Sequence, residues 1–382
     1  MDQRERYTFV VMATDQHTKG SGLLIAVMLV CLGVASRASA QRSIHLTGTF
    51  QVLTEFSPFQ VSTSHPPSIV TWTSPTLRSA TPGNELVLSW NAKTPGSSGF
   101  EFEARAKNAK GWTPYYSLGR WAERTNTFLR QSVAKQKDVD GEVLTDLLRL
   151  SHSTREFQLR IRLTPDSAGS LPTLRSLGIS IIDTSRHAES RPPNLSVWGN
   201  SLNVPQISQH AYVSGKAWCS PTSLSMVLGY WAERLHAPEI KRDVAEVAQG
   251  VFDPVWGGTG NWPFNTAYAG TFDSLEAHVV RLRDLRDVED LIGNKTPVIL
   301  SVDLNALHEK KRNQVDGHLV VAVGFTETGD VWINDPDTTY PPVPGKAVRR
   351  IYPREAVDRA WAASHRTIYL IQPVDQPAPR LR

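Results

Sequence analysis

The chain has 382 residues, of which 40% are hydrophobic and 20% are charged, and its formal net charge at pH 7 is +4. This composition is typical of a soluble globular protein, and the length predicts about two domains, each large enough to bury a core. Because the sequence contains no block of Lys and Arg and no array of basic and aromatic residues, we expect no nucleic-acid partner.

Residues 1–40 have the order of a secretory signal peptide. Basic residues precede an apolar run over 22–34, and the small residues Ala38-Ser39-Ala40 follow it as a cleavage site. The run is too short to cross a bilayer comfortably, since a transmembrane helix needs about 20 apolar residues. The sequence therefore predicts a Sec-type signal that directs the chain to a secreted or extracytoplasmic location. An uncleaved membrane anchor is the alternative.

Residues 41–185 are predicted to form a β-sandwich domain. Stretches that alternate apolar and polar residues, as strands with one buried face do, occur at 68–73, 85–90, 100–105 and 157–163. Turn residues separate them at Pro82-Gly83-Asn84, at 95–99 and at Pro165-Asp166. Strands at this spacing, with few helical stretches, are typical of a sandwich. Jelly-roll and immunoglobulin-like topologies fit the pattern equally well.

The pattern changes in the second half of the chain. Residues 186–200 are polar, contain Arg191-Pro192-Pro193 and are predicted to be a linker. Within the following domain, 201–375, apolar residues at helical spacing predict a helix over 220–235. Strands are predicted later in the domain, at 298–302, 319–325, 331–334 and 367–371. A helix followed by an antiparallel sheet indicates an α+β domain, and residues 376–382 are expected to be a frayed tail.

Cys219 is the residue that needs an explanation. Cys31 is the second cysteine of the chain and lies in the predicted signal, so the mature protein would carry one thiol and no internal disulfide. Cys219 is either an inert buried residue or a reactive one. Pro221 suits the first turn of a helix and Ser220 can cap it, which places Cys219 at the helix N-terminus. Unpaired N–H groups and the helix dipole favour an anion there, as a thiolate nucleophile requires.

His318 is the candidate base for this thiol. It opens the first strand of a predicted hairpin, 319–325 and 331–334. With a loop of four residues, Phe325 pairs with Asp330, and this pairing fixes the register of the whole hairpin. A histidine at the edge of a strand is often only structural, so its value as a base depends on the acid that the register brings to it.

The same register decides which acid orients the His318 ring. It sets His318 opposite Asp337 and puts Asp335 two residues along on the same face, about 7–8 Å away between backbones, which side chains can span. Asp335, or the nearby Asn334, is therefore the candidate, whereas a slip of one residue would turn Asp335 to the other face. Asp335-Pro336 is also a common turn starter. The ordered set of cysteine, histidine and carboxylate nevertheless favours a Cys/His/Asp relay.

Several segments resemble the bacteriocin-processing peptidase-like group of papain-like cysteine peptidases, named for cutting after double-glycine leaders. The similarity runs from about 202 to 371, and its segments are 204–209, 218–222, 226–228, 317–324 and 331–336. The resemblance implies an exported papain-like peptidase in which Cys219 is the nucleophile, His318 the general base and acid, and Asp335 the residue that orients the imidazole.

The same family places a glutamine before the cysteine, with its amide directed at the oxyanion. Gln209 matches best, and Gln206 is the reserve. With the Cys219 backbone N–H, this amide would stabilise the charge of the tetrahedral intermediate. Two departures stand out: Ser220 replaces a common glycine, and the glutamine lies further from the cysteine than in the leader peptidases. The transporter membrane domain of those peptidases does not accompany the resemblance either. We therefore do not expect cleavage of double-glycine leaders.

The sequence predicts no cofactor and no metal site. His308-Glu309 lacks the second histidine of a zinc-peptidase helix. The glycine-rich stretch 256–264 lacks the Gly-Lys-Ser/Thr of a phosphate loop, so a nucleotide is not expected. That stretch is either a rigid surface loop packed by its own tryptophans or a part of the cleft.

Together these observations predict an exported cysteine hydrolase that cleaves a peptide or amide bond through an acyl-enzyme, with a peptide or protein as substrate. A cell-wall amidase or an acyltransferase on the same fold remains open, as does a catalytically silent binding module. A contact of the N-terminal domain with a glycan or the cell envelope is suggested by architecture alone.

Overall fold

The structure is a computed structural model, and it describes residues 43–64, 68–125, 127–186, 189–310, 315–339 and 347–376. The predicted signal, 1–40, and all of the predicted tail except Gln376 lie outside the described residues. Residues Gln41–Arg382 group into a single unit, which is the one described below. None of the helices in the described ranges has the length and apolar character needed to cross a bilayer.

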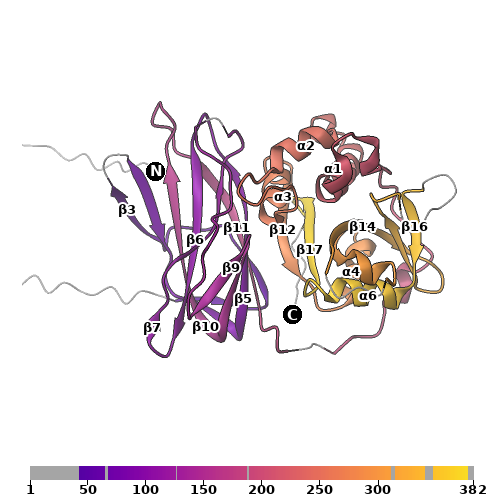
Figure 1. Cartoon of the computed structure of the whole chain (residues 1–382), viewed down its shortest axis with the longest axis horizontal. Coiled ribbons are helices and arrows are strands. Elements are labelled where there is room, and N and C mark those ends of the chain that lie inside the picture. Colours follow the sequence, from indigo (N-terminus) through magenta and orange to yellow (C-terminus); the bar gives the residue numbers. More distant parts are fainter. Residues whose placement is uncertain are drawn as a thin grey trace, which may run out of the picture. The chain divides into compact units, whose positions relative to one another are not determined.

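The N-terminal part of this unit is mostly β: no helix occurs among its described residues before 195 (Figure 1). Its strands are β1 (Ile44–Leu46), β2 (Phe50–Leu53), β3 (Gln60–Ser64), β4 (Ile69–Thr73), β5 (Leu77–Lys93), β6 (Gly99–Asn108), β7 (Gly111–Trp112), β8 (Tyr116–Trp121), β9 (Gly141–Leu144), β10 (Leu147–Thr164) and β11 (Thr173–Ile182). They are hydrogen-bonded into one 11-stranded system whose main path runs β2-β11-β5-β10-β4-β3. The four predicted strands fall within β4, β5, β6 and β10.

Aromatic side chains from β5, β6 and β8 fill the core of this part. Trp90, Phe102 and Trp121 are each fully buried. The rings of Trp90 and Phe102 stack with their centroids 4.0 Å apart, and Trp121 meets Trp90 edge-on at 6.5 Å. Large aromatic side chains each bury a wide apolar area, so these three account for a substantial share of the stability of the strands.

The turn predicted at Pro82-Gly83-Asn84 is wrong, because these residues lie inside the long strand β5. The ladder between β5 and β10 shifts register twice opposite them. Gly83 lies so close to β11 that a Cβ atom would come within 2.3 Å of Ile181 Cγ2. The residues that usually make turns therefore mark an irregular ladder and a close approach of two strands. The turns predicted at 95–99 and 165–166 do separate strands.

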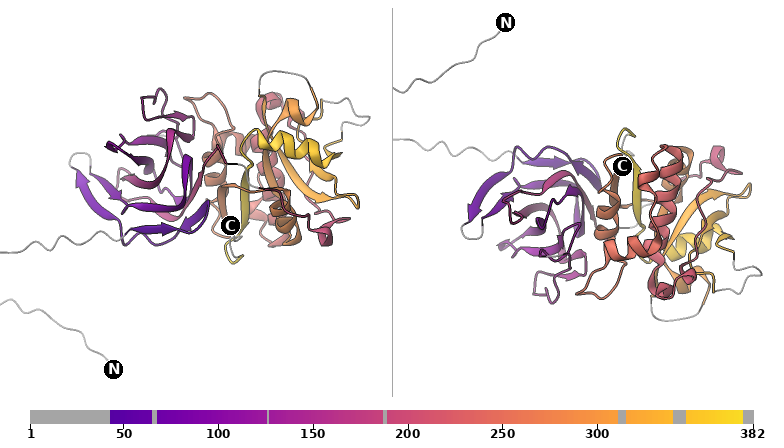
Figure 2. Two further views of the ribbon diagram at one scale, coloured as in Figure 1. Left: turned by 90° about the horizontal axis from the view of Figure 1, so that it is seen from below. Right: turned by 90° about the horizontal axis from the view of Figure 1, so that it is seen from above.

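The C-terminal part contains helices and an antiparallel sheet, a division that is visible from two further sides in Figure 2. The helices are α1 (Cys219–Arg234), α2 (Val244–Val251), α3 (Trp262–Ala269), α4 (Leu285–Gly293), α5 (Leu304–Leu307) and α6 (Arg354–Ala362). The strands are β12 (Leu275–Arg281), β13 (Val298–Asp303), β14 (Gly317–Phe325), β15 (Val331–Asn334), β16 (Arg349–Tyr352) and β17 (Thr367–Pro373). Their order is β12-β17-β13-β14-β15-β16.

The predicted helix is α1, and it is buried almost all round rather than along one stripe. A helix covered on every side lies in the core, and here polar side chains fix it in place. Ser223 Oγ donates to the Leu319 carbonyl of β14 at 2.9 Å, and Trp231 Nε1 donates to the Ile371 carbonyl of β17 at 3.0 Å. The start of α1 is thereby held beside the start of β14.

A buried ion pair joins β5 of the N-terminal part to β12 of the C-terminal part. Arg281 Nη1 lies 2.7 Å from Glu85 Oε2, and the two side chains are 1% and 0% exposed. Arg149 of β10 contacts the other oxygen of Glu85 at 2.8 Å. Burial tends to raise the pKa of Glu85, but Arg281 and Arg149 hold it below its ordinary value. The carboxylate is therefore charged and bound from both sides.

Replacing Glu85 with Ala is expected to lower the free energy of unfolding by about 3–5 kcal/mol, because Arg281 would remain buried without its carboxylate. Urea denaturation of the full chain measures this. Glu246→Ala removes a pair between the exposed Glu246 and the partly buried Arg242 and should cost less than about 1 kcal/mol. Equal losses in the two variants would show that the buried pair has no special role.

Candidate active site

Cys219 is the first residue of α1, and its side chain is partly buried and free of any disulfide. The N-cap is Trp218, which makes no side-chain capping bond. The expected cap by Ser220 is wrong: Ser220 lies inside the helix, and its hydroxyl meets the Tyr369 hydroxyl at 3.0 Å. Because no side chain caps the helix, the N–H groups of its first turn can face an anion at the position of the sulfur.

His318, in β14, is 3% exposed and lies between the thiol and a carboxylate. Its Nε2 is 2.8 Å from Asp335 Oδ1. The thiol of Cys219 is near enough to the same ring to raise its pKa. Since Nε2 faces Asp335, Nδ1 is the nitrogen left for the thiol. The structure thus brings Cys219, His318 and Asp335 together in the order that a relay requires.

The register of the hairpin was predicted correctly at His318, although the predicted turn was wrong. Phe325 pairs with Val331 rather than with Asp330, so the loop has five residues, 326–330. If this pairing continued along the whole ladder, Asp335 would lie on the face of the sheet opposite to His318. A bulge between Ala322 and Gly324 shifts the ladder back by one residue, and Ala322 then pairs with Ile333 as predicted.

The segment before α1 stabilises this bulge. The Val323 carbonyl, which the bulge leaves out of the ladder, accepts from the Leu202 N–H at 2.7 Å. At Gly324 a Cβ atom would lie 2.2 Å from the Asn200 carbonyl oxygen, so glycine is required there. Residues 200–202 therefore lie across the bulge and hold it.

The electrostatics of the pair favour a charged imidazole. Burial by itself lowers the pKa of His318, but the charge of Asp335 and the hydrogen bonds to Asp335 and Cys219 raise it to about 10. Burial tends to raise the pKa of Asp335, and the charge of His318 together with bonds from His308, His318 and Tyr352 holds it well below its ordinary value. The two groups form an imidazolium–carboxylate pair.

Asp335 has further partners that sequence reasoning missed. The Tyr352 hydroxyl donates to Oδ2 at 2.7 Å, and the Asp337 N–H donates to Oδ1 at 2.9 Å. His308 Nε2 and Arg350 Nη1 lie 3.6 and 3.8 Å from Oδ2. His308 was considered only as part of a metal motif. The carboxylate is therefore held in one orientation by bonds to both oxygens.

Arg350 and Tyr352 were missed because strand β16 was not predicted. In this strand they point inward, whereas Ile351 between them is 49% exposed. This inverts the usual pattern of apolar residues inside and polar residues outside, so hydrophobic alternation gives the wrong face. The one available signal for this strand was that Arg350 and Tyr352 are two residues apart, since side chains at that spacing share a face of a strand.

Gln209 is bonded both to the segment before Cys219 and to the segment after Asp335. It is 3% exposed, and its Nε2 donates to the Lys216 carbonyl, just before Cys219, at 2.9 Å. Its backbone N–H donates to the Pro336 carbonyl, just after Asp335, at 3.0 Å. A side-chain amide has two N–H groups, so one remains for a ligand.

Gln206 and Asn334, the alternatives to Gln209 and Asp335, are bonded to other parts of the domain. Gln206 accepts from the Arg349 N–H of β16 at 3.3 Å. Asn334 donates to the carbonyls of Val204 and Pro205 and accepts from the Arg349 side chain. The residue that contacts the His318 ring is therefore Asp335 and not Asn334. In the described ranges, no group of three or more His, Cys, Asp or Glu side chains is arranged to hold a metal ion.

Two family models match the chain. Residues 32–181 match the Peptidase C39 N-terminal domain, and residues 201–369 match the Peptidase C39 like family. No curated protein matches. Among solved structures, a Bacillus anthracis protein named for its likeness to C39 peptidases is 18% identical and covers 46% of this chain and 96% of its own, with a TM-score of 0.32. That score is too low to support an argument about the fold. Because C39 models match both parts, the chain belongs to the C39 family of papain-like cysteine peptidases.

Proposed function

We propose that the chain is an exported cysteine hydrolase that cleaves a peptide or amide bond through an acyl-enzyme, with Cys219 as nucleophile and His318 as general acid and base. The observation that carries this proposal is the position of the His318 ring, which is bonded to Asp335 and lies near enough to Cys219 for the thiol to raise its pKa. An inert cysteine would need no histidine beside it and no carboxylate to orient that histidine.

The reaction begins with the thiolate of Cys219, paired with the imidazolium of His318. The sulfur attacks the carbonyl carbon and forms a C–S bond, and the C–N bond breaks as His318 gives its proton to the leaving amine. Water then attacks the thioester while His318 accepts one of its protons. The C–S bond breaks, the carboxylic acid leaves, and the thiolate and imidazolium are restored.

In this proposal Asp335 and Gln209 assist without forming covalent bonds. Asp335 keeps the imidazole in the orientation in which Nδ1 faces the sulfur. Gln209 supplies its second amide N–H, together with the Cys219 backbone N–H, to the oxygen that becomes negative in the tetrahedral intermediate. The bond from Gln209 to the Lys216 carbonyl fixes the amide before substrate binds, which is what such a donor requires.

We further infer an α+β peptidase domain at 201–375 after a β-sandwich at 41–185 and a linker at 186–200. The pairing of β5 with both β10 and β11 and the antiparallel order of β12 to β17 support this division. Export rests on the signal pattern over 1–40, and a peptide or protein is the substrate class. The sandwich would contact a glycan or the cell envelope.

Replacing Cys219 or His318 with Ala should lower kcat/KM by about 10⁶-fold, and replacing Asp335 with Ala by about 10⁴-fold, by analogy with other catalytic triads. Hydrolysis of a peptide library and labelling by a thiol-directed activity probe measure this. Equal labelling of wild type and His318→Ala would contradict the proposed pair. Labelling of wild type no faster than a free thiol would indicate a binding module instead.

Asp335→Asn should lower the pKa of His318 from about 10 towards or below the ordinary 6.5, because burial then acts without an opposing charge. NMR titration of the His318 ring measures this directly. In wild type, the raised pKa adds stability that is complete below pH 6.5 and is lost as the pH rises through about 10. Unfolding measured across that range should therefore show an alkaline loss that the Asn variant lacks.

Gln209→Ala should lower kcat by about 100- to 1,000-fold with little change in KM, because the lost bond forms in the transition state. Gln206→Ala is the matched control and should leave kcat unchanged, since Gln206 bonds to β16. Steady-state kinetics on one peptide substrate compare the two. A similar effect of both substitutions would remove Gln209 from the oxyanion site.

A further inference from the structure

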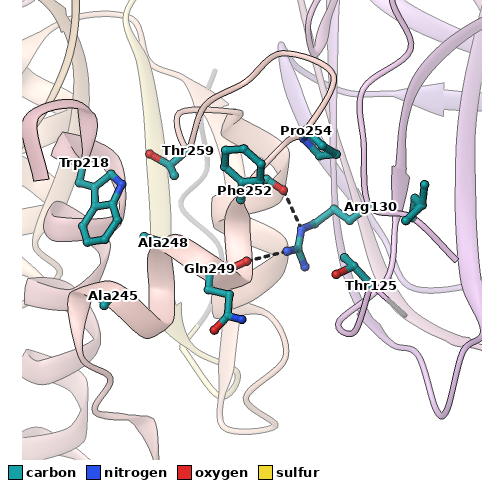
Figure 3. Close-up of a pocket in the computed structure, with 10 residues that line it drawn as sticks. Thr125, Arg130, Trp218, Ala245, Ala248, Gln249, Phe252, Pro254 and Thr259 are labelled. Atoms are coloured by element: carbon teal, nitrogen blue, oxygen red, sulfur yellow. Dashed lines mark hydrogen bonds between the residues drawn. The ribbon is translucent and has the colours of Figure 1, made fainter. Parts of the chain in front are cut away.

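A cavity of about 590 Å³ is lined by Trp218, the residue before the candidate nucleophile. Helix α2 forms one wall and Trp218, the residue before Cys219, forms another (Figure 3). The apolar groups that line it are Leu129, Ala245, Ala248, Phe252 and Pro254, and the polar ones are Thr125, Arg130, Gln249 and Thr259. The lining is therefore mainly apolar, with a few groups that can bond to a peptide backbone.

The wall formed by Trp218 belongs to the same backbone segment as the sulfur. Trp218 is the N-cap of α1, and Cys219 is the first residue of that helix. The Thr259 hydroxyl, from the glycine-rich stretch, donates to the Ala217 carbonyl at 3.2 Å. That stretch thus contacts the segment before Cys219 through Thr259, while the Trp256 ring packs on the stretch's own Gly258 and Gly260. A ligand in this cavity would therefore contact the residue that precedes Cys219.

The opposite wall comes from the N-terminal part of the chain. Arg130, which is 3% exposed, reaches from that part to the end of α2. Its Nη2 donates to the Gln249 carbonyl at 2.8 Å and its Nε donates to the Phe252 carbonyl at 3.3 Å, as Figure 3 shows. Its Nη1 donates to the Ala122 carbonyl at 3.1 Å. The guanidinium therefore forms part of the wall, and its N–H groups are engaged by backbone carbonyls rather than by a ligand.

A second contact from the N-terminal part stabilises the same wall. Asp253 is fully buried, and its Oδ1 accepts from the backbone N–H of Ser132 at 3.1 Å and from that of Val255 at 3.1 Å. Its Oδ2 accepts from the Asn261 side chain at 3.1 Å. Through this carboxylate, the glycine-rich stretch and the N-terminal part are held together. The walls of the cavity are therefore fixed by buried hydrogen bonds.

We propose that this cavity is a substrate subsite, shared by the two parts of the chain, that binds a large apolar side chain of the peptide. This inference rests on the proposed function and adds the substrate class to it. Leucine, phenylalanine or methionine fits the lining, whereas aspartate does not, because Arg130, the cation among the described lining residues, is engaged by carbonyls. Leu129, from the N-terminal part and 46% exposed, lines the cavity without belonging to the core.

The test uses the full chain with Cys219→Ala, so that peptides bind without turnover. Pentapeptides of alanine carry one Leu, Phe, Gly or Asp, placed at each position in turn, and tryptophan fluorescence reports binding. At one position the Leu and Phe peptides should bind about 10- to 100-fold more tightly than the Gly and Asp peptides. A lack of preference at every position would overturn the proposal.

Two further variants locate the preference in the cavity. Leu129→Glu adds a charge to the lining and Ala245→Trp fills it from an exposed position of α2, and each should bring the binding ratio close to one. Val139→Glu adds the same charge to the N-terminal part at an 84% exposed residue outside the cavity and should leave the ratio unchanged. An unchanged ratio in the first two variants would overturn the proposal.

The proposed function fails separately. It fails when the wild-type thiol neither reacts with an activity probe nor turns over peptides, whatever the binding ratios are. A retained apolar preference with an unreactive thiol would leave a peptide-binding cavity without catalysis. A reactive thiol without the preference would leave the peptidase and remove the subsite.

Discussion

The site depends on one buried charge pair, His318 with Asp335. Two opposite charges taken out of water are costly unless each is well bonded, and a lone charge at this depth would cost far more. The structure meets this condition on the acid side, where Tyr352, His308, Arg350 and the Asp337 N–H surround the carboxylate. On the histidine side, the second nitrogen is left for the thiol. The orientation of the His318 ring is thus a consequence of how Asp335 is held.

The position of the sulfur depends on packing rather than on polar contacts of its own. Helix α1 is buried along nearly its whole length, and Ser223 and Trp231 bond it to strands β14 and β17. Because β14 also carries His318, one helix–strand contact sets the distance between Cys219 and His318. This arrangement leaves the first turn of the helix without a side-chain cap, while nearly the whole helix is buried in the core.

Much of this could be predicted from the sequence, where the pattern was strong. The helix after Cys219 and the strand after His318 follow from periodicity. The relation of Asp335 to His318 was predicted with a loop of four residues, and it holds because the unpredicted bulge in β14 offsets the fifth loop residue. Strand β16 could not be predicted, because Arg350 and Tyr352 face inward and Ile351 outward. The turn predicted at Pro82-Gly83-Asn84 was wrong for a different reason. Residues that suit turns also suit an irregular strand that another strand approaches closely.

The bulge in β14 has a consequence for how such chains can vary. The loop residues 326–330 and the extra residue between Ala322 and Gly324 both stand outside the pairs of the ladder. A change in length at either place can therefore leave Asp335 on the face of His318, whereas one residue added to or lost from the paired stretch 331–335 would turn the acid away. Related chains should therefore vary in length in the loop and at the bulge, and not between Val331 and Asp335.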